Sequence, residues 1–561
     1  MGSLWMPTSV PEIPHLVEAL DLSVRFADAD KDALHNVSFS IRAGECLAVL
    51  GPSGSGKSTL AQALVGAIPL LISAERRGVV SWNRKNLRSG NEAAPFLAAG
   101  TGLAAVVLQD TDAQIVALTV EEELAFSLEN RGLPASEIDR RLDGCLSEAP
   151  LIGLGRRDQT LVLSAGWRQR LALGAALAET PSLLVIDEPT AHLDETAAEA
   201  AFEAIAAALR SGASALLIEH RADLACTVAD RILALDRNGH MIALGTPRDV
   251  LSALACLPDS AGIRLPAYMI AVEALRSNGL FEPARCPADS AELVDALRGP
   301  GQEFARKTAA GALAPKRAFT EPGIRQSPLC SLKEITLIRR GDTVLRELDF
   351  TICSGEVVGL AGRNGAGKTS LALVAAGALK PTLGSVSRQG NRPPVMVPQN
   401  PSLVFASATL ALEAERRCLS WPCVADALTR MGIEADPAAH PLRHSHGELR
   451  RIALAFAFAS DTSRLVILDE PTAGLDSYGM RALRHAILEL EDKGCGLLLI
   501  SHDLDFLGDT AGRIAVLDQG VLVASDRSDR IVYRAAAGEL PLGGPPRAEL
   551  AKRLGWKPCD A

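Results

Sequence analysis

The sequence predicts an α/β fold that is built twice along one chain. Three observations predict it. In each half a glycine-rich loop follows an apolar strand and precedes a helix, in "CLAVLGPSGSGKSTLAQALVG" and "VVGLAGRNGAGKTSLALVAAG". A second apolar strand ends in paired acids, in "LLVIDEPT" and "LVILDEPT". A third ends in histidine, at the same distance from the acids in both halves, so the repeat extends over whole domains.

The 561 residues are too many for one hydrophobic core, and we expect two domains. The strand and helix patterns place the first domain at residues 15–282 and the second at 329–540. Residues 283–328 are rich in Pro, Gly and Ala and predict a linker. Residues 541–561 predict a loose tail.

Composition excludes several classes of protein. The net charge of −10 argues against nucleic acid as the main partner. The 11 cysteines are scattered without a CxxC pair, which favours a reduced, cytosolic protein over a disulfide or zinc scaffold. The N-terminal segment lacks the pattern of a signal peptide. No apolar run approaches the roughly 20 residues that span a bilayer, so we expect no membrane crossing.

The two glycine-rich loops fit the pattern GxxxxGK[ST] between a strand and a helix. Glycines allow backbone N–H groups to surround phosphate oxygens, and the helix N-terminus adds a positive dipole. Lys57 and Lys368 would reach the outer phosphates, and the hydroxyls of Ser58 and Thr369 would bind Mg²⁺. The candidate phosphate-binding residues are Gly51, Pro52, Ser53, Gly54, Ser55, Gly56, Lys57, Ser58 and Thr59 in the first half and Gly362, Arg363, Asn364, Gly365, Ala366, Gly367, Lys368, Thr369 and Ser370 in the second.

The paired acids at the strand ends suggest a metal ligand followed by a catalytic group. Asp187 and Asp469 are candidates to bind Mg²⁺, mostly through water. Glu188 and Glu470 are candidates to polarise the attacking water. A pair of helix-capping acids is the alternative, and the accompanying phosphate loops disfavour it.

Two further polar positions follow apolar strands in both halves. His220 and His502 could contact the γ-phosphate and orient the water, although a single histidine at a strand end is more often structural. Gln109 and Gln399 could contact Mg²⁺ and sense the phosphate, whereas a loop glutamine facing solvent is the alternative. The matching positions in the two halves favour the functional interpretation.

Together these motifs resemble the ATP-binding cassette (ABC) superfamily, because Walker A, Q-loop, signature, Walker B, D-loop and H-loop occur in this order twice. The resemblance implies two P-loop NTPase domains, each with a mixed-sheet, RecA-like core and a helical signature subdomain. It implies ATP hydrolysis with Mg²⁺ at two composite sites, formed by intramolecular pairing of the cassettes. Each site would join the P-loop of one cassette to the signature of the other. The signature and D-loop residues that it adds are Ser164, Gly166, Asp194, Ser445, Gly447 and Asp476.

One stretch of the sequence indicates a subgroup of this superfamily. The sequence "LQDTDAQIVALTVEEELAFSLENRGLP", together with "IEHR" and "LPAYMIAVEALRSNGL", is similar to the ATPases of energy-coupling-factor (ECF) importers of vitamins and of cobalt or nickel ions. The second half has a weaker copy, with Thr409 at the position of Thr119. The resemblance implies a peripheral protein at the cytoplasmic face of the cell membrane. Its partners would be an ECF-type transmembrane coupling protein and a substrate-binding membrane protein.

Two alternatives stay open. One is the ATPase of a conventional importer for sugars or other solutes, which the stretch after Gln109 disfavours. The other is a soluble ribosome-associated ABC protein, which usually carries a long basic helical arm between its cassettes, whereas residues 283–328 contain Pro and Gly and are not strongly basic. A DNA-repair ABC ATPase would carry zinc cysteines or large insertions, and neither is evident.

The halves differ at two expected binding positions. The signatures "LSAGWRQR" and "HSHGELRR" depart from LSGGQ, and an imidazole at His446 would hinder close backbone approach. We therefore expect the site that combines Lys57 and Glu188 with "HSHGELRR" to be the weaker. Phe26 lies where the family has an aromatic residue stacked on adenine, and Arg339 lies near that place in the second half.

Overall fold

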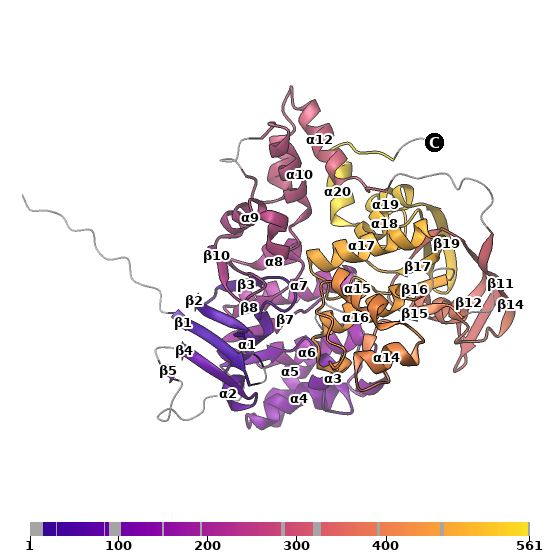
Figure 1. Ribbon diagram of the computed structural model, residues 1–561. Helices are drawn as coiled ribbons and strands as arrows, with labels where there is room; N and C mark the ends of the chain where they lie inside the picture. The colour runs from indigo at the N-terminus through magenta and orange to yellow at the C-terminus, as the bar shows by residue number, and fades with distance from the viewer. Residues whose placement is uncertain are drawn as a thin grey trace, which may run out of the picture. The chain divides into compact units, whose positions relative to one another are not determined.

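The computed structural model describes residues 15–27, 29, 31–82, 85–88, 103–147, 151–190, 193, 195–281, 286–317, 327–389, 393–460 and 465–558. The chain divides into two compact units, unit 1 at residues 1–263 and unit 2 at residues 264–561 (Figure 1). Residues 264–281 thus belong to the second unit, although the sequence prediction placed them in the first domain. In the described part of the chain, no helix combines the length and apolarity that a membrane crossing requires.

Unit 1 begins with an antiparallel sheet of strand order β2-β1-β4-β5. Leu22 and Val24 of β1 are fully buried, as the period of two along a strand requires for one face of a sheet. The strands of this sheet are β1 (His15–Phe26), β2 (Leu34–Arg42), β4 (Ala74–Trp82) and β5 (Lys85–Arg88).

A six-stranded sheet of order β10-β9-β3-β8-β7-β6 forms the centre of unit 1. Its strands pair in parallel except β10, which is antiparallel to β9. Its central strands are buried throughout and almost entirely apolar, as is typical of parallel strands covered on both faces. The strands are β3 (Cys46–Leu50), β6 (Ala104–Val107), β7 (Leu183–Asp187), β8 (Ser214–Ile218), β9 (Arg231–Leu235) and β10 (Met241–Gly245).

The helices of unit 1 fall into two groups. The first group follows or flanks the strands of the sheets and comprises α1 (Lys57–Leu64), α2 (Ala67–Leu70), α7 (Glu195–Arg210), α8 (Ala222–Val228), α9 (Pro247–Ala255) and η3 (Pro258–Gly262). The second group forms a helical subdomain with an apolar core of its own. It comprises α3 (Thr111–Gln114), α4 (Val120–Asn130), α5 (Ala135–Ser147), η2 (Thr160–Val162) and α6 (Ala165–Ala178).

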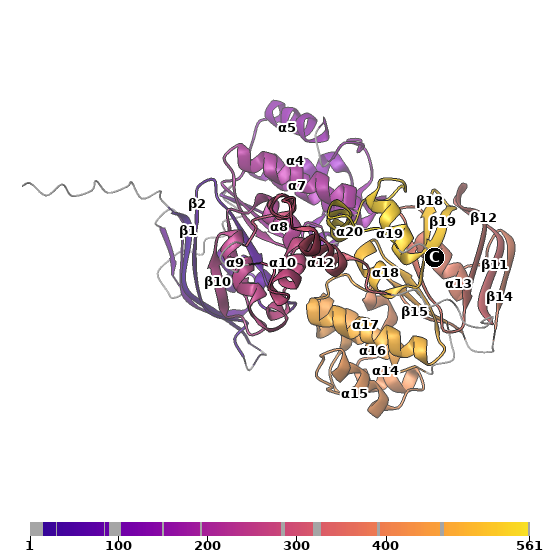
Figure 2. The same ribbon diagram turned by 90° about the horizontal axis from the view of Figure 1, so that it is seen from above.

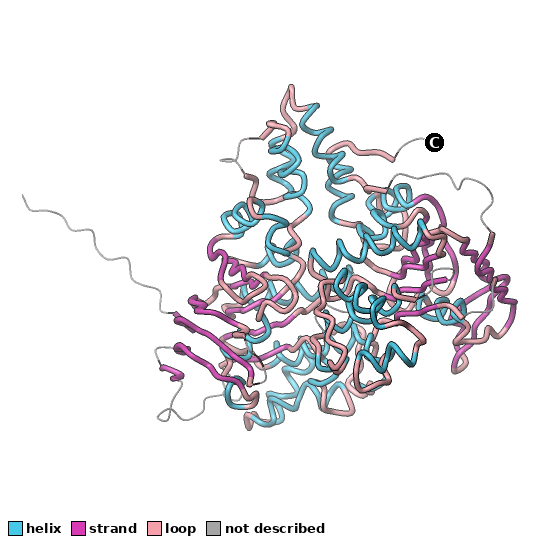
Figure 3. Tube along the Cα trace, in the orientation of Figure 1, coloured by secondary structure: helices cyan, strands magenta, loops and turns pink. Residues whose placement is uncertain are grey.

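Unit 2 repeats this plan with an antiparallel sheet and a six-stranded mixed sheet, and the strands of both are drawn magenta in Figure 3. The antiparallel sheet has the order β12-β11-β14 and consists of β11 (Pro328–Arg339), β12 (Asp342–Cys353) and β14 (Leu383–Arg388). The mixed sheet has the order β15-β16-β17-β13-β18-β19 and consists of β13 (Val357–Ala361), β15 (Val395–Val397), β16 (Leu465–Asp469), β17 (Gly496–Ile500), β18 (Arg513–Asp518) and β19 (Val521–Arg527).

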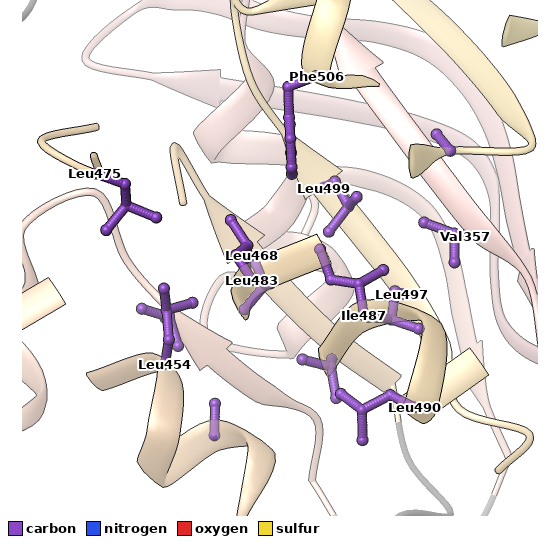
Figure 4. Packing of buried hydrophobic residues seen from close by; sticks show 14 of the residues in the cluster. Val357, Leu454, Leu468, Leu475, Leu483, Ile487, Leu490, Leu497, Leu499 and Phe506 are labelled. Atoms are coloured by element: carbon purple, nitrogen blue, oxygen red, sulfur yellow. The ribbon is translucent and has the colours of Figure 1, made fainter. Parts of the chain in front are cut away.

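The helices that correspond to those of unit 1 surround this sheet. They are α13 (Lys368–Ala376), η5 (Pro401–Val404), α14 (Leu410–Arg416), α15 (Trp421–Arg430), η6 (Pro441–Arg443), α16 (His446–Phe458), α17 (Ser477–Asp492) and α18 (Leu504–Thr510). Leu483 and Ile487 of α17 belong to one buried cluster with Leu468 of β16 and Leu497 and Leu499 of β17 (Figure 4). The fold prediction of two mixed-sheet domains with helical subdomains is confirmed.

Unit 2 carries additional helices at both of its ends, three of which lie where the sequence predicted a linker and a tail. Helix α12 packs on α10 and on α20, and α20 also contacts α19 (Figures 1 and 2). The additional helices are α10 (Ala267–Ser277), α11 (Ser290–Ala296), α12 (Glu303–Leu313), α19 (Ser528–Ala536) and α20 (Pro546–Arg553). The sequence prediction is therefore corrected here, because segments expected to be loose form helices with buried faces.

An ion pair joins the last helix to the rest of unit 2. The Arg547 guanidinium of α20 donates to both carboxylate oxygens of Asp509 at the end of α18. Arg484 of α17 donates to the same carboxylate at 2.8 Å, and the backbone N–H of Lys316 donates to it at 2.8 Å. Asp509 and Arg547 are both buried. Three groups from separate parts of the sequence thus meet at one carboxylate.

We expect the Arg547→Ala variant to lower the free energy of unfolding by about 3 kcal/mol, because it leaves a buried carboxylate short of a partner. Urea unfolding followed by circular dichroism measures the change. Arg553→Ala, on an exposed position of the same helix, is the control and should change stability by less than about 1 kcal/mol. Equal losses in the two variants would contradict the role of the pair.

Candidate active sites

The two glycine-rich loops lie between β3 and α1 and between β13 and α13, as predicted. Gly56 and Gly367 cap these helices in the left-handed backbone region, at φ of 85° and 102°. A Cβ atom on Gly56 would lie 2.3 Å from the carbonyl oxygen of Ala33. Glycine is therefore required by both conformation and space at this position. Ser55 has a buried Oγ without a hydrogen-bond partner among the described residues.

Each loop lysine donates hydrogen bonds to backbone carbonyls at the start of its own loop. The Lys57 ammonium donates to the carbonyl oxygens of Gly51 and Pro52 at 2.8 and 2.9 Å. The Lys368 ammonium donates to the carbonyl of Gly362 at 2.7 Å and to that of Arg363. Both lysines are buried. Each loop thus places a positive charge beside the N-terminus of its helix, as phosphate binding requires.

Each candidate Mg²⁺ aspartate lies beside the hydroxyl that follows the loop lysine. Thr369 Oγ1 donates to Asp469 Oδ2 at 2.8 Å, and Ser58 forms the corresponding hydrogen bond to Asp187. The other carboxylate oxygen, Oδ1, is buried in both aspartates and has no partner among the described residues.

Burial, together with the neighbouring glutamate, raises the pKa of Asp187 and of Asp469 to about 6. A free carboxylate oxygen beside a hydroxyl is the donor set that Mg²⁺ uses together with nucleotide phosphates and water. The residues present therefore fit this ion.

The glutamates that follow these strands have strained backbones that aim them into the sites. Glu188 has φ of 53° and Glu470 has φ of 49°, a region that residues other than glycine seldom occupy. The N–H of Glu188 donates to Ile218 of β8 at 2.9 Å, and the N–H of Glu470 donates to Ile500 of β17 at 2.8 Å. The turn that carries each glutamate is thus fixed to the strand that leads to the histidine.

The predicted histidines contact these glutamates directly. His220 Nε2 lies 2.6 Å from Glu188 Oε1, and His502 Nδ1 lies 2.9 Å from Glu470 Oε2. Burial alone would raise the pKa of Glu188, but His220 and Lys57 outweigh it and lower the pKa to about 2. In the second unit, burial is likewise outweighed, and His502 holds the pKa of Glu470 below its ordinary value.

The two predicted glutamines lie differently in the two units. The Gln109 amide donates to Glu188 Oε2 at 2.8 Å. The Gln399 side chain is exposed and has no hydrogen-bond partner within the described part of unit 2, while its carbonyl accepts from Arg450. Unit 1 therefore assembles all of its predicted loop, acid, histidine and glutamine residues, and unit 2 assembles all except the amide of Gln399.

The two signature serines are the N-caps of the helices that follow them. Ser164 Oγ accepts the N–H of Trp167 at the start of α6, and Ser445 Oγ accepts the N–H of Glu448 at the start of α16. The backbone N–H of Ser445 donates to the Glu448 carboxylate at 3.0 Å, which closes a capping box. The Ser445 hydroxyl donates to the same carboxylate at 2.9 Å. The hydroxyl of the second signature serine is thus already hydrogen-bonded to the carboxylate of a neighbouring residue.

The adjacent glycines, Gly166 and Gly447, are buried in the first turns of α6 and α16. Asp476 caps α17 through the N–H of Gly479 at 2.7 Å. Asp194 and the side chains of Ala165 and His446 lie outside the described residues. The steric effect predicted for His446 therefore stays a prediction.

The expected adenine-binding positions are equivalent in the two sheets. Phe26 ends β1 and Arg339 ends β11, two residues after Val24 and Leu337, which pair with Leu34 and Leu345. Phe26 is half-buried against the core of unit 1, whereas Arg339 is exposed. Phe26 thus contributes to core packing, and its stacking on adenine stays a prediction.

Three further residues, which were not predicted from the sequence, contact these sites. Gln169 of α6 donates to the Glu188 carbonyl at 3.1 Å, and Arg450 of α16 donates to the Glu470 carbonyl at 2.9 Å. Glu219 accepts the Thr190 hydroxyl and the N–H of His220. Gln169 and Arg450 both lie five residues after the signature serine, and this common offset is the signal that could have identified them.

A family model described as "ABC transporter" matches residues 34–191 and 345–473. A putative ABC transporter ATP-binding protein of Streptomyces coelicolor is 30% identical over 540 residues, which cover 91% of this chain and 94% of that protein. A putative HMP/thiamine import ATP-binding protein of Bacillus subtilis is 26% identical over 90% of both chains. An archaeal ribosome recycling factor, aABCE1, solved in complex with a ribosomal stalk protein, shares the fold, with a TM-score of 0.59 and 20% identity over 92% of both chains.

We expect Gly56→Ala to weaken nucleotide binding at least about tenfold, because the methyl group adds a backbone clash to an unfavourable φ. Gly54→Ala is the matched control, since Gly54 has a φ of 78° but a Cβ atom there would meet no described atom within 4 Å. Titration with a fluorescent nucleotide measures both variants. The explanation would be wrong if the two substitutions weakened binding to the same extent.

Proposed function

The chain belongs to the ABC transporter family of ATP-binding proteins, and on this premise we propose that it is the ATP-hydrolysing subunit of an ECF-type importer. The imported solute would be a micronutrient such as a vitamin or a cobalt or nickel ion. The chain would lie at the cytoplasmic face of the membrane. Its partners would be a transmembrane coupling protein and a substrate-binding membrane protein.

The family is one of ATPases, and the geometry of each unit accounts for hydrolysis. Lys57 and the N-terminus of α1 neutralise the phosphate chain, and the Ser58 and Asp187 oxygens would hold Mg²⁺. When bound, Mg²⁺ supplies positive charge that stabilises the charge developing on the phosphate oxygens. The Glu188 carboxylate accepts a hydrogen bond from the attacking water and polarises it.

His220 holds the Glu188 carboxylate in place from one side and can orient the water toward the γ-phosphate. The Gln109 amide donates to the other oxygen of the same carboxylate. In unit 2, Lys368, Thr369, Asp469, Glu470 and His502 play the corresponding parts.

An apolar surface beside the Q-loop of unit 1 is the observation that carries the importer proposal. Leu118 and Leu161 expose 66% and 79% of their area, and Val116 and Val162 are also exposed. The N–H of Thr160 donates to the Leu118 carbonyl at 3.0 Å, so the two apolar segments lie side by side. Exposed apolar side chains gathered in one place favour a protein partner.

A buried acid holds this surface in shape. Glu123 accepts the backbone N–H groups of Val116 and Ala117 at 3.0 and 2.9 Å. Thr119 and Glu122 form a capping box at the start of α4. A preformed apolar surface attached to the Q-loop suits an amphipathic helix of a membrane protein, because motion of that helix would reach Gln109 through the chain.

Unit 2 has the same kind of hydrogen bond from the backbone to a buried acid, but the surface beside it is less apolar. Glu413 accepts the N–H of Ala406, and Thr409 caps α14. Leu442 is exposed at the position equivalent to Leu161. Positions equivalent to Val116 and Leu118 are alanines, Ala406 and Ala408. We therefore propose that unit 1 makes the larger apolar contact with the membrane partner.

The name of the Bacillus subtilis relative supports a vitamin-related solute, although its 26% identity does not extend to a specific substrate. A conventional importer for sugars is the second candidate within transport. Ribosome association is the third candidate, which the fold likeness to the recycling factor leaves open.

We further propose that the two cassettes pair within one chain and form two unequal ATP sites. The occupied Ser445 supports this inequality, because Glu448 competes with a phosphate for the serine hydroxyl. The site that combines Lys57 and Glu188 with Ser445 would then be the slower.

We expect Leu161→Asp and Leu118→Asp to abolish capture of polytopic membrane proteins by the tagged chain, because a charge in an apolar contact costs much of the binding energy. The measurement is affinity purification from gently solubilised membranes followed by mass spectrometry. Leu71→Asp is the control, since Leu71 is exposed but lies outside the helical subdomain. Recovery of ribosomal proteins in place of membrane proteins would contradict the importer function.

We expect Glu470→Gln to lower the turnover number of the assembled complex by about tenfold or more, and Glu188→Gln to lower it by less. The site that contains Glu188 is proposed to be the slower one, so it contributes less of the total turnover. Steady-state ATPase assays of the two single variants measure the difference. Equal losses would overturn the inequality but not the ATPase activity.

A further inference from the structure

Arg450 occupies the place in unit 2 that Gln169 occupies in unit 1, and it makes two contacts that Gln169 does not make, to the carbonyls of Asp469 and Gln399. Its guanidinium donates through Nη1 to the carbonyls of Glu470 and Asp469, at 2.9 and 3.4 Å. Through Nη2 it donates to the carbonyl of Gln399. Gln169 donates only to the Glu188 carbonyl among the described residues, and its own Oε1 has no partner there.

The environment of Arg450 is unusual for a cation. The side chain is fully buried, its Nη atoms donate to backbone carbonyls and not to a carboxylate, and its Nε has no hydrogen-bond partner among the described residues. A buried charge without a paired acid is costly unless its donors are used. Burial lowers the pKa of Arg450 to about 10, so the guanidinium stays charged at neutral pH. Its planar array of donors can serve several carbonyls at once, which a glutamine amide cannot.

The contacts of Arg450 compensate for a bond that unit 2 lacks. In unit 1 the Q-loop is joined to the acid by the Gln109 side chain, which donates to Glu188. In unit 2 the Gln399 side chain is exposed and makes no such bond to Glu470 in the described structure. There the connection between the Q-loop and the acid-bearing turn runs through backbone carbonyls and Arg450.

We infer that Arg450 is a positioning residue that fixes the backbone at Gln399 to the turn of Asp469 and Glu470, so that the signature helix α16, the Q-loop and the acid of unit 2 move as one body. In unit 1 the corresponding connection can be broken by rotation of the Gln109 side chain alone. The two cassettes therefore transmit nucleotide binding to their Q-loops unequally. The inference rests on the ATPase activity of the chain and does not depend on which partner or solute it serves.

The test is hydrogen–deuterium exchange of the full chain without nucleotide or partner, comparing Arg450→Gln with the unchanged protein. The glutamine restores the side chain found in unit 1 and removes the bridge. We expect exchange in residues 398–405 to rise about tenfold, because a hydrogen bond to a charged donor is lost. Arg450→Lys should show a similar rise, since one ammonium cannot span the three carbonyls.

Arg451→Gln is the matched control. Arg451 is the next residue of α16, is also buried, and donates to the carbonyls of Met431 and Gly432 away from the Q-loop. Its loss should lower the melting temperature without a selective rise in residues 398–405. A selective rise in Arg451→Gln, or unchanged exchange in a folded Arg450→Gln, would overturn the inference.

A second readout uses activity. In a Glu188→Gln background, the remaining turnover depends on Glu470, and adding Arg450→Gln should lower kcat about tenfold while KM changes little, because positioning and not binding is affected. Adding Arg451→Gln should leave the ratio of kcat to KM close to that of the background. Loss of folding in Arg450→Gln would be seen in its melting temperature, and Arg450→Lys then supplies the comparison. Failure to recover a membrane partner would refute the importer proposal without bearing on either readout.

Discussion

The parallel register between the strand that ends in acids and the strand that ends in histidine is the constraint on which both sites depend. Asp187 pairs with Ile218 and Asp469 pairs with Ile500, so the strands end at the same level. One more hydrogen bond, from the glutamate N–H, holds the strained turn in place. The glutamate and histidine then meet without any contribution from a flexible loop, because the side chains leave the same edge of a rigid sheet.

The two units keep this constraint and vary what surrounds it. The bond between Q-loop and acid is made by a side chain in unit 1 and through Arg450 in unit 2. The residue before the histidine is Glu219 in one unit and Ser501 in the other. The chain thus preserves the geometry that hydrolysis needs, while the charge and stiffness around each acid have diverged between the halves.

The core of each site could be predicted because spacing along the chain determines it. Lys57, Glu188 and His220 each follow a recognisable strand, and parallel strands bring such ends together. Arg450 could not be predicted in this way, since its role depends on how the helical subdomain packs against the sheet. Helix α12 was missed because its Ala and Gly content indicated a linker, although Ala305, Ala309 and Leu313 follow the helical period and are buried.

The contact of α12 with α20 bears on how the chain is synthesised. Residues 264–317 leave the ribosome before the sheet strands of unit 2, whereas α20, which also packs on α12, is made only after those strands. Helix α10 can cover part of the buried face of α12 as soon as both are made, but the part that α20 covers stays exposed until unit 2 is nearly complete, whereas unit 1 is complete much earlier. A chain truncated before Pro546 would leave this part of the apolar face uncovered and open to aggregation, even with both catalytic centres fully translated.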